Sequence, residues 1–171
     1  MATEVIYRLR EVRVSKVIAA AAGYTANDVV NDDICTTTSD PWEFTVGASN
    51  SRSGYITGAT IFSETASLTP RLTLFLFNAT PTCALTDNVA STCPVAADRS
   101  KWIGRIDFPA MSEIGAVAST TMATPSTVGN LPLGYQCAAA DTKIYGVLVT
   151  KDAFTQTATN DIEIVLMVEQ C

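Results

Sequence analysis

The chain has 171 residues, with 11 basic and 17 acidic side chains and no histidine, so its formal net charge is −6. A sequence without histidine has no Ser-His-Asp or Cys-His catalysis and no histidine-containing zinc site. Apolar residues make up 47% and charged residues 16%, a balance typical of one globular domain and not of a disordered chain. No apolar run reaches the roughly eighteen residues of a membrane span, and an acidic chain binds nucleic acid poorly.

The first sixteen residues differ in charge from the rest of the chain. They carry four basic against two acidic side chains, a net charge of +2, whereas the remainder carries seven against fifteen, a net charge of −8. Apolar and charged residues alternate in this segment, as in a half-buried strand or an extended arm. We expect an N-terminal arm that contacts an acidic neighbour through Arg8, Arg10 and Arg13. An ordinary first strand and a short alanine-rich helix over 10–22 are the alternatives.

Turn-forming residues over 23–41 predict a linker after this arm. We therefore divide the chain into an arm with its linker, 1–41, and a folded domain, 42–171. Within the linker, Asn31, Asp32 and Asp33 offer oxygen ligands of the kind that calcium prefers. They lack the glycine and the distal glutamate of an EF-hand loop, so they predict a solvated turn and no metal site.

From residue 42 onward, apolar and polar residues alternate with the period of β-strands. Residues 72–77 differ because they are apolar on both parities, which is typical of a strand buried on both faces. Gly58 predicts a bulge or a close backbone approach within another strand. Strands are expected at 42–46, 55–63, 72–77, 101–108, 143–150 and 162–169, with one or two short strands within 112–141.

These strands, the frequent β-branched residues and the lack of a convincing helix predict an all-β fold. A two-sheet β-sandwich, most economically a jelly roll, encloses such a set of strands. The expected core includes aliphatic residues of two strands: Leu72, Leu74, Leu76, Ile164 and Leu166.

Five cysteines are present, and none of them forms a C-x-x-C pair. Cys83 and Cys93 bracket a polar loop with little apolar area, and a disulfide between them would contribute roughly 2–3 kcal/mol. The alternative is a set of separate thiols in a reducing cytosol. Residues 1–13 lack the apolar core of a secretory signal, so we expect synthesis in the cytoplasm.

Catalytic and ligand-binding patterns are weak throughout the sequence. A glycosidase needs two carboxylates at a defined distance from each other. Four residues are candidates, but their sequence separation does not place any two of them at that distance: Glu43, Glu64, Asp107 and Glu163. Six aromatic residues would suit a sugar-binding face, although such residues more often fill a core or a subunit interface: Tyr24, Trp42, Tyr55, Trp102, Tyr135 and Tyr145. We therefore expect a structural or binding protein, with no enzymatic activity and no cofactor.

Over about residues 50–169 the order of segments resembles the head decoration, or cement, proteins of tailed bacteriophages. The resemblance is carried by residues 53–67, by 70–81 with its Leu72-Thr73-Leu74-Phe75-Leu76-Phe77-Asn78 strand, and by the polar loop that runs on to Asp98. It continues in Trp102-Ile103-Gly104-Arg105-Ile106-Asp107-Phe108-Pro109, Leu131-Pro132-Leu133, Tyr145-Gly146-Val147-Leu148-Val149, Ala153-Phe154-Thr155 and 162–168. The cysteines Cys83, Cys93 and Cys171 depart from that pattern.

The resemblance implies a β-sandwich, often trimeric, that binds the major capsid protein on the exterior of the virion and is made in the host cytoplasm. It implies no catalytic residue, no direct contact with nucleic acid and no membrane. A receptor- or glycan-binding jelly roll of a phage fibre or spike is the alternative function.

Overall fold

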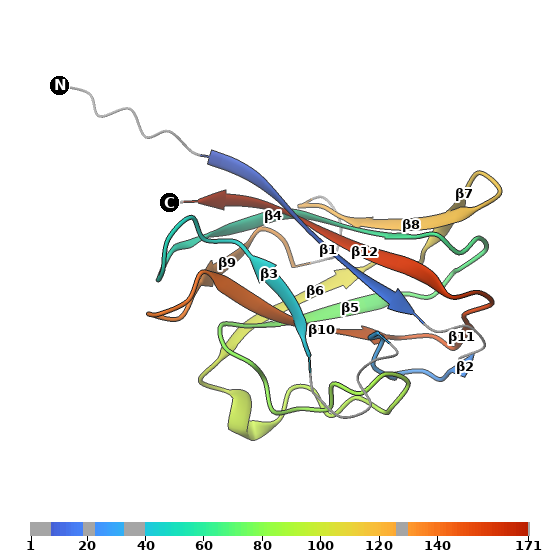
Figure 1. Ribbon diagram of the computed structural model, residues 1–171, viewed down its shortest axis with the longest axis horizontal. Helices are drawn as coiled ribbons and strands as arrows, with labels where there is room; N and C mark the ends of the chain where they lie inside the picture. Colours follow the sequence, from blue (N-terminus) through green and yellow to red (C-terminus); the bar gives the residue numbers. More distant parts are fainter. Residues whose placement is uncertain (1–7, 19–22, 33–39, 126–129, 171) are drawn as a thin grey trace.

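Two antiparallel sheets pack face to face and enclose the main apolar core (Figure 1). The computed structural model describes residues 8–18, 23–32, 40–125 and 130–170, and of Arg8 only the backbone. The expected all-β sandwich is confirmed. No helix in this part of the chain is long and apolar enough to cross a membrane.

The first sheet, here sheet 1, has the order β1-β12-β4-β8-β7, and β9 pairs with the other end of β4. Sheet 2 has the order β3-β10-β5-β6, and β2 with β11 forms a small separate ladder. The strand bounds in sheet 1 are β1 Arg8–Ile18, β4 Ser53–Ser63, β7 Ser112–Ile114, β8 Ala118–Ala123, β9 Leu133–Gln136 and β12 Asn160–Gln170. The others are β2 Gly23–Tyr24, β3 Trp42–Thr45, β5 Leu72–Phe77, β6 Trp102–Phe108, β10 Lys143–Thr150 and β11 Phe154–Thr155, with one short 3₁₀ helix, η1, at Ala96–Asp98.

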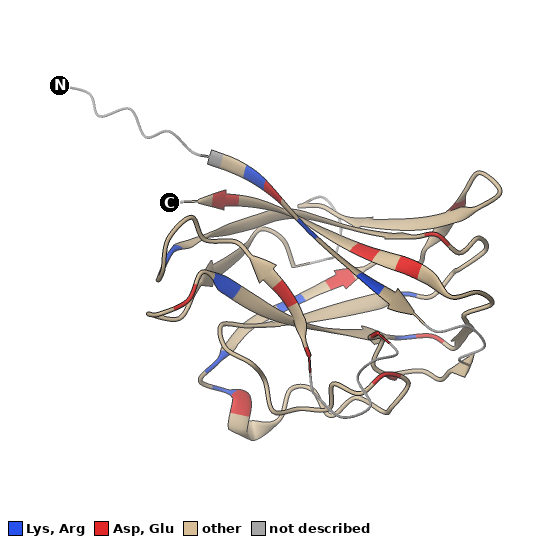
Figure 2. Cartoon of the chain, in the orientation of Figure 1, with Lys and Arg blue, Asp and Glu red and all other residues tan. Residues whose placement is uncertain are grey.

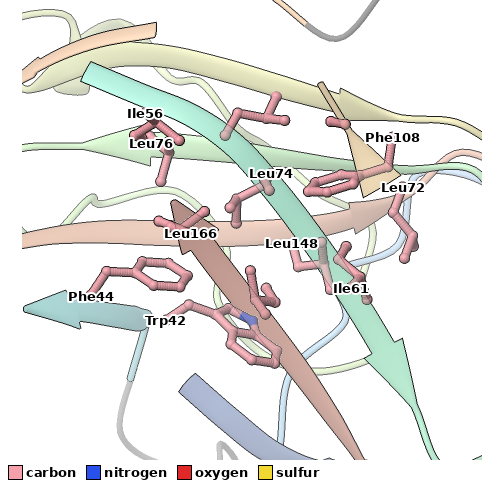
Figure 3. Close-up of a cluster of buried hydrophobic side chains, with 14 of the residues drawn as sticks. Trp42, Phe44, Ile56, Ile61, Leu72, Leu74, Leu76, Phe108, Leu148 and Leu166 are labelled. Atoms are coloured by element: carbon pink, nitrogen blue, oxygen red, sulfur yellow. The ribbon is translucent and has the colours of Figure 1, made fainter. Parts of the chain in front are cut away.

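Alternating side chains from the two sheets meet in the main core, as the strand pattern predicted. Trp42 and Phe44 fill one end of it, and the aliphatic side chains of β5 face those of β4 and β12 (Figure 3). All five expected core residues are buried: Leu72, Leu74, Leu76, Ile164 and Leu166. Gly58 adjoins the predicted bulge, because Met167 pairs with Gly58 while Val168 pairs with Ile56, which leaves Thr57 as the extra residue.

The second face of β5 is covered by the β5–β6 loop, residues 78–101. Phe75 and Phe77 pack there in a separate cluster with Val147 and Val149 of β10, and Leu85 of the loop joins them. The prediction that β5 is buried on both faces is confirmed. The prediction that this loop has little apolar area to hold it is wrong, because Leu85 and Cys83 are both buried against sheet 2.

The segment expected as an arm is, from Arg8 onward, an edge strand of sheet 1. β1 pairs with β12 along its whole length, from Arg8 opposite Gln170 to Ile18 opposite Asn160. The structure therefore has the ordinary first strand in place of the alternative helix. Residues 1–7, residues 19–22 and residues 33–39 of the expected linker lie outside the described residues.

We expect Leu74→Ala to lower the free energy of unfolding by about 2–5 kcal/mol, because it leaves a cavity between the two sheets. Leu9→Ala is the matched control, since the same atoms are removed from a side chain that is 60% exposed, and it should cost at most about 0.5 kcal/mol. Urea unfolding of both variants measures the difference. Equal costs would mean that the burial of β5 has been misassigned.

Candidate functional site

Four apolar side chains lie exposed on the outer face of sheet 1. They come from three neighbouring strands and the turn between two of them, and we call them the apolar patch: Phe62, Ile114, Val117 and Met122. Thr60 pairs with Met122, Phe62 with Thr120 and Ile114 with Ala118, so the strand residues of the patch share one face. Their exposed fractions run from 39% for Phe62 to 73% for Val117.

The patch is the uncharged half of this face. β4 and β8 carry no charged residue, whereas β1 carries charges of both signs and β12 carries only acidic residues (Figure 2). Arg13 of β1 forms an ion pair with Glu11 and a second one, at 2.7 Å, with Glu163 of β12. Exposed pairs of this kind contribute little stability. Because one arginine faces two glutamates, and because Asp161 and Glu169 share the parity of Glu163 along β12, the β1–β12 half of the face stays acidic. A partner that docks on the patch therefore meets apolar groups with an acidic pair of strands beside them.

The structure does not bring the three predicted contact arginines together. Arg10 and Arg13 differ in parity along β1, so their side chains leave opposite faces of the strand. The Nη1 atom of Arg10 lies 3.5 Å from the carbonyl oxygen of Gly47, and the side chain of Arg8 lies outside the described residues. Arg13 is held by its two glutamates and belongs to the outer face of sheet 1.

Lys16, which follows in the same strand, fastens β1 to the loop beside β3. Its ammonium group donates hydrogen bonds to Asn31 Oδ1 at 2.6 Å and to the carbonyl of Asp40 at 2.8 Å, and it lies 5.5 Å from the centre of the Trp42 ring. Asn31 is buried and donates to the carbonyl of Leu85 at 2.7 Å. The expectation of a solvated turn is therefore wrong for Asn31, whose amide oxygen accepts from a lysine; Asp33 lies outside the described residues.

The β5–β6 loop is closed by a disulfide between Cys83 and Cys93, whose Cα atoms lie 5.2 Å apart. This is the pairing expected from the sequence. Cys137 is the one free cysteine among the described residues, and burial raises the pKa of its thiol. Cys35 and Cys171 lie outside the described residues.

Asp98 of η1 is a fully buried carboxylate that ties the two ends of this loop together. It accepts hydrogen bonds from the backbone N–H of Thr82 at 2.9 Å, the hydroxyl of Thr82 at 3.0 Å and the backbone N–H of Cys83 at 3.2 Å. Lys101 lies 3.4 Å away. Burial alone would raise the pKa of Asp98, but the hydrogen bonds from Thr82 and Lys101 bring it below its usual value.

The six aromatic residues considered for a sugar-binding face divide into two groups. Trp42 and Tyr24 are buried, and the hydroxyl of Tyr145 donates a hydrogen bond to Asp141 at 2.6 Å. Tyr55, Trp102 and Tyr135 line a common hollow beside the sandwich edge. Their grouping has no sequence signature, because they come from β4, β6 and β9.

The four carboxylates considered for hydrolysis are distributed over both sheets. Glu43 pairs with Lys143, Asp107 with Arg105 at 3.1 Å and Glu163 with Arg13. Glu64 follows β4 and accepts a long hydrogen bond from the backbone of Asp161. Within the described ranges, no group of three or more Cys, Asp and Glu side chains is placed to hold a metal ion.

No protein-family model matches the chain, and no curated protein matches it.

We expect reduction of the Cys83–Cys93 disulfide to lower the free energy of unfolding by roughly 2–3 kcal/mol, because the bond closes a loop with a sequence separation of 10. Unfolding with and without dithiothreitol measures this effect. The Cys83→Ala/Cys93→Ala double variant is the control and should not respond to the reductant. Non-reducing peptide mapping that finds either cysteine free, or paired with another cysteine, would contradict the assignment.

We expect Asp98→Asn to lower the free energy of unfolding by about 1–3 kcal/mol near neutral pH, because the buried N–H of Cys83 and the part-buried N–H of Thr82 lose a charged acceptor. The pKa of Asp98 is lowered by folding, so its contribution is complete above the unfolded pKa of about 3.9. It is lost as the pH falls through the lower pKa of the folded state.

Urea unfolding between about pH 3 and pH 7 tests this linkage, which requires the gap between wild type and Asp98→Asn to shrink at acidic pH. Glu113→Gln on the exposed strand β7 is the control, and it should change stability by at most about 0.5 kcal/mol. A gap that does not vary with pH would show that Asp98 does not act through its charge.

Proposed function

We propose that the chain is a decoration protein that binds the exterior of a bacteriophage head shell and stabilises the assembled lattice. The observation that carries the proposal is the apolar patch, because Phe62, Ile114, Val117 and Met122 remain exposed on one uncharged half of a sheet. Grouped exposed apolar side chains on a folded domain mark surfaces that other proteins cover. The proposed partner is the major capsid protein.

The connectivity of the sandwich supports a viral structural role. Among the eight principal strands, β1, β12, β4 and β8 are consecutive in one sheet, and β3, β10, β5 and β6 are consecutive in the other. The chain changes sheet at every step between them except from β5 to β6. We infer a jelly roll from this order, an architecture that recurs in viral capsid and lectin domains. A fold of this kind serves several functions, so the proposal depends on the surface.

The segments that resemble phage decoration proteins belong mostly to the centre of the fold. They include β4, β5, β6, β10 and β12, which supply most of both sheets. The resemblance therefore concerns the order of core strands and the turns between them, and it gives the proposal its particular partner, the head shell.

A decoration protein stabilises a shell by mass action. Because it binds the assembled lattice and not the free subunits, each bound copy shifts the equilibrium towards assembly. We further propose a homotrimer, in which three weak contacts act together and gain avidity when the spacing of their sites fits the lattice. The protein would be made in the host cytoplasm and would then reside on the capsid exterior, where a disulfide persists after release of the particle.

Stoichiometry in purified particles tests the proposal. Quantitative mass spectrometry should find the chain in copies comparable to the lattice sites of the head. A copy number in the range of fibres or spikes, far below that of the capsid protein, would overturn it in favour of the receptor- or glycan-binding alternative.

We expect Met122→Glu to abolish binding to empty head shells, because docking would bury a new charge without a partner. Val89→Glu is the matched control, since Val89 is exposed on the β5–β6 loop, which covers the other sheet. Co-sedimentation with shells assembled from the capsid protein of the same genome measures binding, and circular dichroism verifies folding. Equal binding by both variants would exclude the patch as the docking surface.

A further inference from the structure

A hollow of about 470 Å³ lies beside the sandwich edge, where β6 of sheet 2 approaches β4 and β9 of sheet 1. Its walls hold two exposed aromatic rings, two side-chain amides and the backbone of glycines, and they hold no charged side chain. The lining residues are Ser53, Gly54, Tyr55, Asn78, Trp102, Ile103, Gly134, Tyr135 and Gln136.

Both exposed rings are held in place by their surroundings. The Tyr55 ring lies over Gly134, where a Cβ atom would stand 3.6 Å from its Cε1. The Trp102 ring packs edge-on against Phe77, with ring centres 5.3 Å apart, and at a tilt against Phe75 at 5.9 Å. These contacts fix two flat apolar surfaces in advance, so a ligand that stacks on them does not have to order them.

Two amides supply polar groups next to these rings. Within the part of the chain that the structure describes, the side chains of Asn78 and Gln136 make no hydrogen bond to protein atoms. The backbone N–H of Asn78 donates to the carbonyl of Lys101 at 2.8 Å, which fixes that residue beside the start of β6. Each amide provides a carbonyl acceptor and two N–H donors, so each can pair with vicinal hydroxyl groups.

We propose that this hollow binds a neutral oligosaccharide. A sugar ring combines a flat C–H face, which fits Trp102 or Tyr55, with hydroxyl groups, which fit Asn78 and Gln136. An entirely apolar ligand would bury these amides without partners at a cost. A polyanion would find no cation in the lining, on a chain whose formal net charge is −6. The site is independent of the proposed shell contact.

Tryptophan indole signals provide a direct readout, because the chain has 2 tryptophans and they differ in exposure, with Trp42 1% and Trp102 37% exposed. The ¹⁵N-labelled full chain is titrated with maltotriose, cellotriose and the β-1,4-linked trimer of N-acetylglucosamine. The titrations extend to about 10 mM, tenfold above a Kd of about 1 mM. We expect at least one trisaccharide to shift the Trp102 indole signal saturably and to leave the Trp42 signal in place.

Variants assign the binding to the hollow. Gln136→Ala should weaken binding about tenfold, the value of one lost hydrogen bond, whereas Asn50→Ala, an exposed amide outside the hollow, should have no effect. Variants of Trp102 lack the indole reporter, so their binding is followed by the backbone amide signals of Gly54 and Gly134, which line the hollow. Trp102→Ala should abolish the shifts of these signals; if it fails to fold, Trp102→Phe keeps a smaller ring and should weaken binding. Unchanged affinity in Gln136→Ala, or no Trp102 shift with any of the three sugars, would overturn the proposal.

Two further arms separate this site from other possibilities. A short oligothymidylate that shifts Trp102 at lower concentrations than every sugar would overturn the assignment in favour of single-stranded nucleic acid, whose bases also stack on aromatic rings. Gln136→Ala should still co-sediment with head shells. Sugar binding without shell binding, or the reverse, therefore shows which of the two proposals fails.

Discussion

The two-sided burial of β5 is the constraint on which the rest of the fold depends. All six residues of Leu72–Phe77 are buried, and their alternation sends the leucines into the sandwich and the phenylalanines to the opposite face. Sheet 2 consequently cannot present that face to water, and the β5–β6 loop must fold back across it. The sandwich thereby acquires a third layer over β5 and β10, made by a segment without strands.

That third layer is held by three interactions of different kinds. Leu85 packs on Phe75 and Phe77, the Cys83–Cys93 disulfide closes the loop, and Asp98 fastens Thr82 and Cys83 to η1. A buried carboxylate is costly unless its oxygens are satisfied, and the donors around Asp98 remove that cost. Since Lys101 contacts Asp98 and Trp102 follows it directly, the same arrangement sets the position of the Trp102 ring at the hollow.

The sequence predicted those strands in which apolar side chains on one face alternate with polar side chains on the other. The alternation of 42–46, 55–63 and 162–169 is that of half-buried strands, and β3, β4 and β12 lie there. The sequence predicts only one or two short strands within 112–141, where β7, β8 and β9 lie. β8 consists mostly of alanine, serine and threonine, which give little contrast between faces, and β7 and β9 are too short, at 3 and 4 residues, to show a period. β1 was ambiguous for a related reason: Lys16 occupies an inward position through its aliphatic stem and its hydrogen bonds, although its residue type marks it as exposed.

The functional surfaces were beyond such patterns, because each joins side chains from several strands. The apolar patch forms because β4, β8 and β7 lie next to one another in sheet 1, and the hollow forms because β6 lies beside β4 and β9. Asp98 needs Thr82, a residue 16 positions away. Local periodicity does not show which strands lie side by side or which distant residues are in contact. These surfaces can therefore be located only once strand pairing and packing are known.

The placement of the two surfaces along β4 makes their proposed roles compatible. Phe62 of the patch lies near the end of β4 that pairs with β8, and Tyr55 of the hollow lies near the end that pairs with β9. They lie seven positions apart along the strand, about 20 Å, and Figure 1 shows β7 and β9 at opposite ends of the sandwich. A shell that covers the patch can therefore leave the hollow open to solvent, because the rigid strand between them keeps the two sites apart. Decoration of the head and capture of a surface sugar would then be properties of the same bound chain, carried by the two ends of one strand.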